Sequence, residues 1–245
     1  MTYCLGILLD AGLVLASDGR SNAGVDQITR VSKLSLMTVP GERVIAIQSA
    51  GNLATTQAVV TELAEAAGKG DPAKDLHLCH SMFEAAHIVG ARLRGVTDAD
   101  ARYVEPYGDP SASFLVSGQI KGEGPRLFQI YSAGNFVEAS GRAPFLQIGE
   151  TKYGKPILDR ALTPDTSLDE AAKLTLLSFD ATVRSNLSVG LPIDLLRYEV
   201  DSFSAANLIT IEEHNLYWRE LRSTYAGGLA ALVASLEPPP AAGSN

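Results

Sequence analysis

The sequence predicts an α+β fold in which two antiparallel sheets are stacked between layers of helices. Three observations lead to this fold class. Short apolar runs separated by turn residues indicate antiparallel strand pairs, and segments with helical spacing of apolar residues follow each group of strands. The 245 residues, of which 46% are hydrophobic, suffice for one domain with a single core. We place this domain at residues 1–236 and predict a disordered tail over the Pro-rich residues 237–245.

The N-terminal part of the chain is expected to form two strand pairs. Two pairs of apolar runs, each interrupted by turn residues, are typical of β-hairpins. The first pair is separated by Asp10-Ala11-Gly12 and the second by Pro40-Gly41. The predicted strands are 2–9 with 13–17, and 33–37 with 43–49.

Helical spacing begins directly after the second strand pair. Apolar residues recur at helical positions after Asn52, and the segment from Gly68 to Pro72 ends this pattern. A second periodic segment follows, and Pro106 and Pro110 then favour an exposed loop. The predicted elements are helices over 52–67 and 74–94 and a loop over 96–110.

The second half of the chain repeats the order of strands followed by helices. Glycine-containing turns separate its apolar runs, and Ser167 with Glu170 forms a capping box that begins a helix. The predicted strands are 112–120, 126–132, 136–140, 144–148, 193–200 and 208–213. Three helices are predicted in this half. One begins near Lys152, one runs from Ser167 to about Leu187, and one covers 215–235.

The first hairpin places polar residues at one end of a sheet. A turn within residues 10–12 pairs strand positions whose numbers sum to about 22 or 23. Thr2 would then lie opposite Arg20 or Ser21, with Asp18 within diagonal reach on the neighbouring strand.

Thr2 can become a nucleophile because of the residue before it. Methionine aminopeptidase removes Met1 when the next side chain is small, and the product carries a free α-amine and a hydroxyl on one residue. An α-amine has a pKa of about 7.7–8.0, so near neutral pH it can accept the hydroxyl proton as a general base. The same pairing of a threonine with its own terminus is a known variant of the catalytic triad.

Two further features complete the predicted site. A lysine ammonium at Lys33 would lower the pKa of the Thr2 hydroxyl and amine, and Asp18 would keep that lysine charged and oriented. Gly51 lies where a strand ends and a helix begins, so backbone N–H groups there can form an oxyanion hole.

These motifs resemble those of a known family. Thr2, Ala16-Ser17-Asp18-Gly19-Arg20, Lys33 and Ser49-Ala50-Gly51 are similar in order and spacing to proteasome core-particle β subunits and the bacterial protease HslV. Those proteins are N-terminal-nucleophile (Ntn) hydrolases with a four-layer αββα sandwich. The opening Met-Thr-Tyr-Cys and Gly24-Val25-Asp26 most resemble the bacterial ancestral-β-subunit (Anbu) branch.

The resemblance implies an activity and a set of site residues. It implies a threonine peptidase or amidohydrolase that needs no cofactor, acts on a peptide or protein, and assembles with copies of itself into a ring or open spiral. It implies no particular ATPase partner. The implied residues are Thr2, Asp18, Lys33 and Ser188 for catalysis, and Gly51, Ser49, Asn22 and Arg20 for the oxyanion and substrate.

Two positions depart from the family pattern. Glu150 stands where family members carry a serine between two glycines, and Ser185 stands at the position of an aspartate that helps to hold the N-terminus. Ser188 matches the family serine, with a helix-end cap as the alternative. The departures leave two other functions open: a scaffold subunit with little or no turnover, and an Ntn amidase that acts on a small modified peptide.

Composition excludes several other classes. A net charge of −8 disfavours nucleic acid as a partner. The N-terminus lacks a basic segment and no apolar run reaches the ~20 residues of a membrane span, so a cytoplasmic protein is expected. We interpret His77, Cys79, His80 and His87 as residues of a helix surface and expect no metal site, and we expect Cys4 in the core.

Overall fold

The computed structural model of the protein describes residues 1–22, 28–163 and 165–240, without the side chains of Asn22 and Ile28. Its strands are β1 (Tyr3–Leu9), β2 (Gly12–Asp18), β3 (Arg20–Asn22), β4 (Ile28–Arg30), β5 (Leu34–Val39), β6 (Arg43–Gly51), β7 (Ala112–Ile120), β8 (Arg126–Ile130), β9 (Phe136–Glu138), β10 (Phe145–Gly149), β11 (Ile193–Glu199) and β12 (Leu208–Ile211). Its helices are α1 (Leu53–Ala66), α2 (Met82–Val104), α3 (Lys155–Ala161), α4 (Leu168–Ser185) and α5 (Leu216–Ser235).

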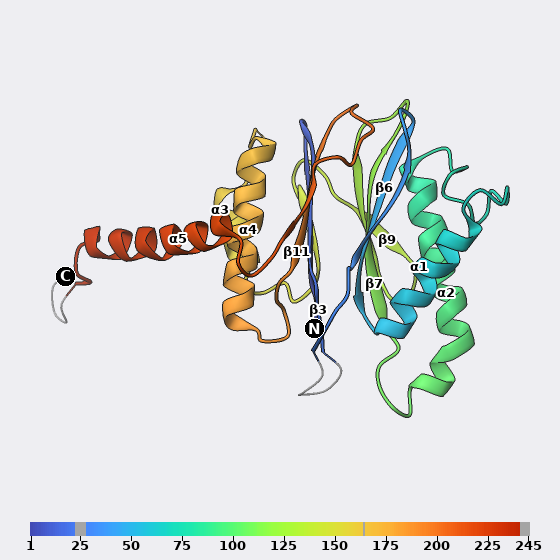
Figure 1. The fold of residues 1–245 in the computed structure, drawn as a ribbon, viewed down its shortest axis with the longest axis horizontal. Coiled ribbons are helices and arrows are strands. Elements are labelled where there is room, and N and C mark those ends of the chain that lie inside the picture. Colours follow the sequence, from blue (N-terminus) through green and yellow to red (C-terminus); the bar gives the residue numbers. More distant parts are fainter. Residues whose placement is uncertain (23–27, 164, 241–245) are drawn as a thin grey trace.

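The elements form four layers. In the described part of the chain, one antiparallel sheet has the order β10-β1-β2-β11-β12 and a second has the order β5-β6-β7-β8-β9; we call them the β1 sheet and the β6 sheet. The two sheets face each other, with α3 and α4 outside the β1 sheet and α1 and α2 outside the β6 sheet (Figure 1). The predicted αββα sandwich of two antiparallel sheets is therefore confirmed.

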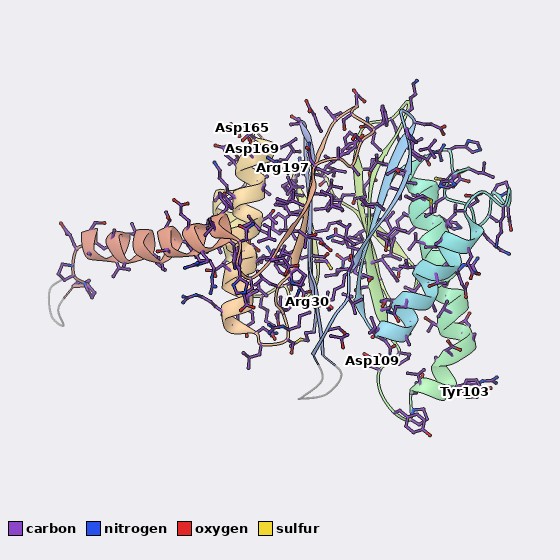
Figure 2. All side chains as sticks on the ribbon, in the orientation of Figure 1. Arg30, Tyr103, Asp109, Asp165, Asp169 and Arg197 are labelled. Carbon is purple, nitrogen blue, oxygen red and sulfur yellow. The ribbon has the colours of Figure 1, made fainter. Side chains whose placement is uncertain are left out.

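Side chains fill each of the three spaces between layers (Figure 2), and the buried ones form three apolar clusters. One cluster packs the β6 sheet against α1 and α2, another packs the β1 sheet against α4, and a third joins the two sheets. Because the inner strands are covered on both faces, their sequences are almost continuously apolar and do not alternate. The same arrangement brings one end of the two sheets together around the N-terminus (Figure 1).

The register of the first hairpin differs from the prediction. Cys4 pairs with Ser17 and Leu9 pairs with Gly12, so paired positions sum to 21. The expected placement of Thr2 opposite Arg20 or Ser21 is therefore wrong by one or two positions. The cause is Gly12, which belongs to β2 with a φ of +139° and leaves only two residues for the turn. A Cβ there would lie 2.0 Å from the Tyr198 carbonyl oxygen, so the tighter turn needs glycine.

The second helix begins and ends later than predicted. α2 begins at Met82, after Ser81 accepts a hydrogen bond from the Glu84 N–H at 3.1 Å. The segment before it is a loop held by the buried Asp75 carboxylate, which accepts hydrogen bonds from the N–H groups of Gly68 and His77. The capping pattern Ser81-x-x-Glu84 signals this helix start in the sequence, and the prediction missed it. Much of the segment predicted as a loop over 96–110 is helical, because the first proline after α2 comes only at position 106.

One other feature, the β3–β4 pair, was not predicted from apolar patterns. β3 and β4 form a short hairpin, with Arg20 opposite Arg30. Its strands are too short and polar to show a recognisable period. Residues 237–240 continue beyond α5 as an exposed segment without helix or strand, while 241–245 lie outside the described residues. The predicted domain boundary at residue 236 remains a prediction.

The last helix leaves the body of the molecule. α5 projects away from the α3–α4 layer (Figure 1), and Trp218 is its one buried residue. The Arg222 guanidinium holds its first half to α4 through Asp180, with Nε–Oδ1 at 2.6 Å. Within the described residues, every helix is too short or too polar to cross a bilayer.

Candidate active site

A buried ion pair lies where the N-terminal ends of β1 and β5 approach each other. Lys33 Nζ donates to Asp18 Oδ1 at 2.6 Å and to the Arg20 carbonyl oxygen at 2.5 Å. The lysine side chain is 6% exposed and the aspartate side chain 0%. The Ser49 N–H donates to the Lys33 carbonyl at 3.0 Å and so ties the lysine backbone to β6. The predicted contact between Asp18 and Lys33 is present.

Backbone donors surround the Asp18 carboxylate. Its Oδ1 accepts from the Tyr3 N–H at 2.9 Å, and its Oδ2 accepts from the N–H groups of Arg20 and Gly190, both at 3.3 Å. Burial raises the pKa of the Asp18 carboxyl above its ordinary value, and the Lys33 ammonium opposes that shift. Asp18 thus binds both the strand that carries Thr2 and the lysine beside it.

Thr2 lies in the wall of a cavity of about 270 Å³. Thr2 itself is 9% exposed. The cavity wall combines residues of the β6 sheet, Ser21 of β3 and residues just before β1 and β5 with the first turns of α1. The described lining residues are Thr2, Ser21, Val31, Ser32, Lys33, Ser35, Ser49, Ala50, Gly51, Leu53, Thr56, Gln57, Val60 and Thr61. The structure therefore places four of the predicted site residues, Thr2, Lys33, Ser49 and Gly51, around one cavity.

The carbonyl of Thr2 is held by the end of β10. The Glu150 N–H donates to the Thr2 carbonyl at 2.7 Å, one position beyond the pair of Tyr3 with Gly149. Gly149 has a φ of +83°, and a Cβ at this position would lie 1.9 Å from the Thr2 carbonyl oxygen. The close approach of the two backbones therefore requires glycine at 149.

Gly51 ends β6 directly before α1, as predicted. Its φ is +114°, and Asn52 caps the helix by accepting hydrogen bonds from the N–H groups of Ala54 and Thr55. Backbone N–H groups at a helix start carry a partial positive charge. The positive end of α1 thus faces the cavity that Thr2 lines, which suits the stabilisation of an oxyanion.

Two predicted residues, Arg20 and Ser188, lie outside the described cavity wall, and the side chain of a third, Asn22, is not described. The Arg20 guanidinium donates to the Leu187 carbonyl at 2.9 Å and is absent from the described cavity wall. Ser188 is also absent from that wall; its N–H binds Asn186 Oδ1 at 2.9 Å. The Asn22 side chain and the Gly24-Val25-Asp26 segment lie outside the described residues. The roles of Arg20, Asn22 and Ser188 remain predictions.

The structure adds site residues that sequence patterns did not indicate. Gly190 contributes a donor to Asp18, and Asn186 binds the Glu150 carboxylate. Both lie in the connection between α4 and β11, and the two contacts span 172 and 36 positions of the chain respectively. No local pattern marks them, because their contacts arise only when β11 pairs with β2.

The histidines and cysteines do not gather at the site. His77, Cys79 and His80 precede α2 in a loop, so their assignment to a helix surface is wrong; the loop is held by Asp75 and by Arg43, which binds the Cys79 carbonyl at 2.9 Å. Cys4 is fully buried in the core, as predicted, and burial raises the pKa of its thiol. Within the described ranges, no three His, Cys, Asp or Glu residues form a potential metal site.

Several solved structures similar to this chain are Anbu proteins. Anbu (ancestral β-subunit) from Yersinia bercovieri is 45% identical, covers 98% of this chain and 99% of its own, and has a TM-score of 0.91. Anbu from Hyphomicrobium sp. strain MC1 is 47% identical, with 98% and 100% covered and a TM-score of 0.89. The helical assembly of the Anbu complex from Pseudomonas aeruginosa is 43% identical, with 99% and 100% covered and a TM-score of 0.94. Comparison with curated proteins found no match.

The fold and the arrangement of the site together define an Ntn-type sandwich of the proteasome class. A family model described as proteasome subunit matches residues 98–195. With this identity over nearly its whole length, the chain belongs to the Anbu family of proteasome-like proteins. The resemblance to proteasome-type proteins and their Anbu branch, expected from the sequence motifs, is confirmed.

Proposed function

We propose that this chain is a proteasome-like threonine peptidase or amidohydrolase that uses Thr2 as its N-terminal nucleophile after Met1 is removed. The observation that supports the proposal most directly is the cavity that Thr2, Lys33, Ser49 and Gly51 line together. Met1 is 66% exposed and Thr2 is 9% exposed, so the residue to be removed lies at the surface while the nucleophile lies in the cavity wall.

Each step of the reaction has a group available for it. Thr2 Oγ attacks an amide carbonyl while the Thr2 α-amine accepts the hydroxyl proton, directly or through water. The Gly51 N–H stabilises the oxyanion, and the Lys33 ammonium lowers the pKa of the hydroxyl. The C–N bond breaks as the α-ammonium gives its proton to the leaving amine, which leaves an acyl ester on Thr2. Water hydrolyses the ester and restores the hydroxyl.

Covalent labelling of Thr2 tests this function. A threonine-reactive β-lactone is expected to add one probe mass to the wild-type chain and none to Thr2→Ala, because only Thr2 combines a hydroxyl with a free amine. Thr61→Ala, which removes another hydroxyl from the cavity wall, is the matched control and should label like wild type. Intact mass spectrometry measures both the label and the removal of Met1.

The outcomes separate the alternative functions. Met1 retained in a chain that still assembles would support the scaffold function, because the amine would be blocked. Removal of Met1 without labelling of Thr2 at any pH would contradict the nucleophile. Labelling together with cleavage of short modified peptides, but not of proteins, would favour the amidase.

The exposed part of α5 supports assembly of the chain with copies of itself. Leu229, Leu232 and Val233 of α5 are 53%, 55% and 64% exposed and recur at helical spacing, so they form one apolar stripe, and Leu236, 64% exposed, follows directly after the helix. A contiguous exposed apolar surface of this kind marks a protein contact. A second copy is the occupant we propose, since a relative 43% identical is described as a helical assembly.

Charge on this stripe is expected to dissociate the assembly. Leu229→Glu with Leu232→Glu should weaken self-association by more than about tenfold, because two carboxylates would lose water in the contact. Ala231→Glu lies on the opposite face of the same helix and should leave assembly unchanged. Sedimentation velocity measures the effect, and an unchanged sedimentation coefficient in the double variant would rule out α5 as the contact.

A further inference from the structure

Glu150 is a buried carboxylate that lacks a counter-charge among the described residues. It is 4% exposed, and no described Lys, Arg or His side chain lies within salt-bridge distance of it. Its Oε2 accepts from Asn186 Nδ2 at 3.0 Å, and its Oε1 accepts from the Lys152 N–H at 3.4 Å. A buried carboxylate is costly to ionise without a cation. Among the described residues, Glu150 is thus a buried carboxylate whose hydrogen-bond partners are neutral groups.

The position of Glu150 suggests where a counter-charge arises. The Glu150 N–H binds the Thr2 carbonyl at 2.7 Å, so the two residues are in direct contact through their backbones. Asn186 Nδ2, which binds the Glu150 carboxylate, also lies 4.0 Å from Met1 Sδ. One amide group thus contacts both the carboxylate and the residue that is removed.

Removal of Met1 turns the Thr2 amide nitrogen into an α-ammonium on the residue whose carbonyl binds the Glu150 N–H. We propose that Glu150, held by Asn186, pairs with the α-ammonium of Thr2 and positions it next to the Thr2 hydroxyl. This inference rests on the proposed function of Thr2. Glu150 acts through the amine, so it is a positioning residue. The exposed Ser185 at the end of α4 supplies no charge, and Glu150 supplies the carboxylate from the end of β10 instead.

Asp18, Lys33 and Arg20, the other described charged residues of the predicted site, already have partners. Asp18 from β2 is paired with Lys33, and the Arg20 guanidinium from β3 binds the Leu187 carbonyl. A carboxylate stabilises a nearby ammonium and raises its pKa, whereas the Lys33 ammonium acts in the opposite direction. Removing the Glu150 charge should therefore lower the pKa of the Thr2 amine, which must be neutral to act as a base.

The pH dependence of Thr2 labelling tests the pairing. In Glu150→Gln, the midpoint of the acid limb of the β-lactone labelling rate should move down by about one pH unit or more. Glu199→Gln is the matched control, because Glu199 is exposed and pairs with Gly12 at the far end of the β1 sheet. Its midpoint should equal that of wild type. Glu150→Asp, which keeps the charge, should stay closer to wild type than Glu150→Gln does.

A second assay separates this inference from the nucleophile itself. Acylation of the α-amine by a water-soluble anhydride, followed by mass analysis of the N-terminal peptide, measures the titration of the amine without any reaction at Thr2 Oγ. A shift in this assay without labelling of Thr2 would keep the Glu150 pairing and reject the peptidase. Equal midpoints for wild type and Glu150→Gln in both assays would overturn the pairing, as would retention of Met1 in the wild-type chain.

Discussion

Replacing Lys33 by methionine is expected to lower the rate of Thr2 labelling by roughly 10²–10⁴-fold, the range in which a positioned acid–base group contributes. Lys33 is the charged residue in the described wall of the cavity, and its ammonium lies 2.6 Å from Asp18. Methionine keeps a long unbranched side chain and removes the charge that lowers the pKa of the Thr2 hydroxyl. The second-order labelling constant, measured by intact mass, gives the result.

A second lysine pair provides the control for this experiment. Lys155 lies 2.6 Å from Asp159, the same distance as in the buried pair, but its side chain is 52% exposed and it belongs to α3. Lys155→Met should therefore label at the wild-type rate. If Lys33→Met is folded by circular dichroism and also labels at the wild-type rate, the proposed role of Lys33 is refuted.

Replacing Asp18 by asparagine is expected to destabilise the fold as well as the site. Removing one partner of a buried ion pair costs about 3–5 kcal/mol, because the other charge remains buried without compensation. For a chain of this size the free energy loss corresponds to a decrease in Tm of roughly 6–20 °C. The NH₂ group of the introduced asparagine would also face backbone N–H groups that bind the carboxylate in the wild-type chain, such as the N–H of Tyr3. Calorimetry measures the change in Tm.

The matched control and a double variant isolate the cause. Asp159→Asn breaks an exposed pair of equal length and should cost less than about 1 kcal/mol. Combining Asp18→Asn with Lys33→Met should recover part of the lost stability, because no buried charge then remains. A Tm of Asp18→Asn equal to that of wild type would show that the pair contributes nothing to the fold.

Local sequence patterns predicted most of the fold but misplaced some boundaries. Strand pairs and the capping box at Ser167 are short-range features, and both appear in the structure. The hairpin register was wrong because whether Gly12 belongs to the turn or to β2 depends on its contact with Tyr198 in β11. The start of α2 was wrong because Asp75 holds the preceding loop, although the Ser81 cap was present in the sequence.

The residues of the candidate site also divide into those that were predicted correctly and those whose contacts depend on the tertiary structure. Thr2, Lys33 and Gly51 were predicted from their chemical types and positions, and Ser49 from the family resemblance; the structure places all four around one cavity. Arg20 and Ser188 were predicted from the resemblance as well, yet their observed contacts lie in the α4–β11 connection. Chemical type and spacing identify candidates, but they do not determine where a long side chain binds.

The sequence by itself determined the four-layer architecture and the presence of a threonine, an aspartate and a lysine near one end of a sheet. Apolar periodicity and strand pairing are local properties, so a single chain displays them. Only the tertiary structure decided which carboxylate has a cation. Asp18 meets Lys33 within the fold, whereas Glu150 is buried at 4% exposure against Thr2 and Asn186. Burial depends on layers distant in the sequence, and burial determines what an unpaired charge costs.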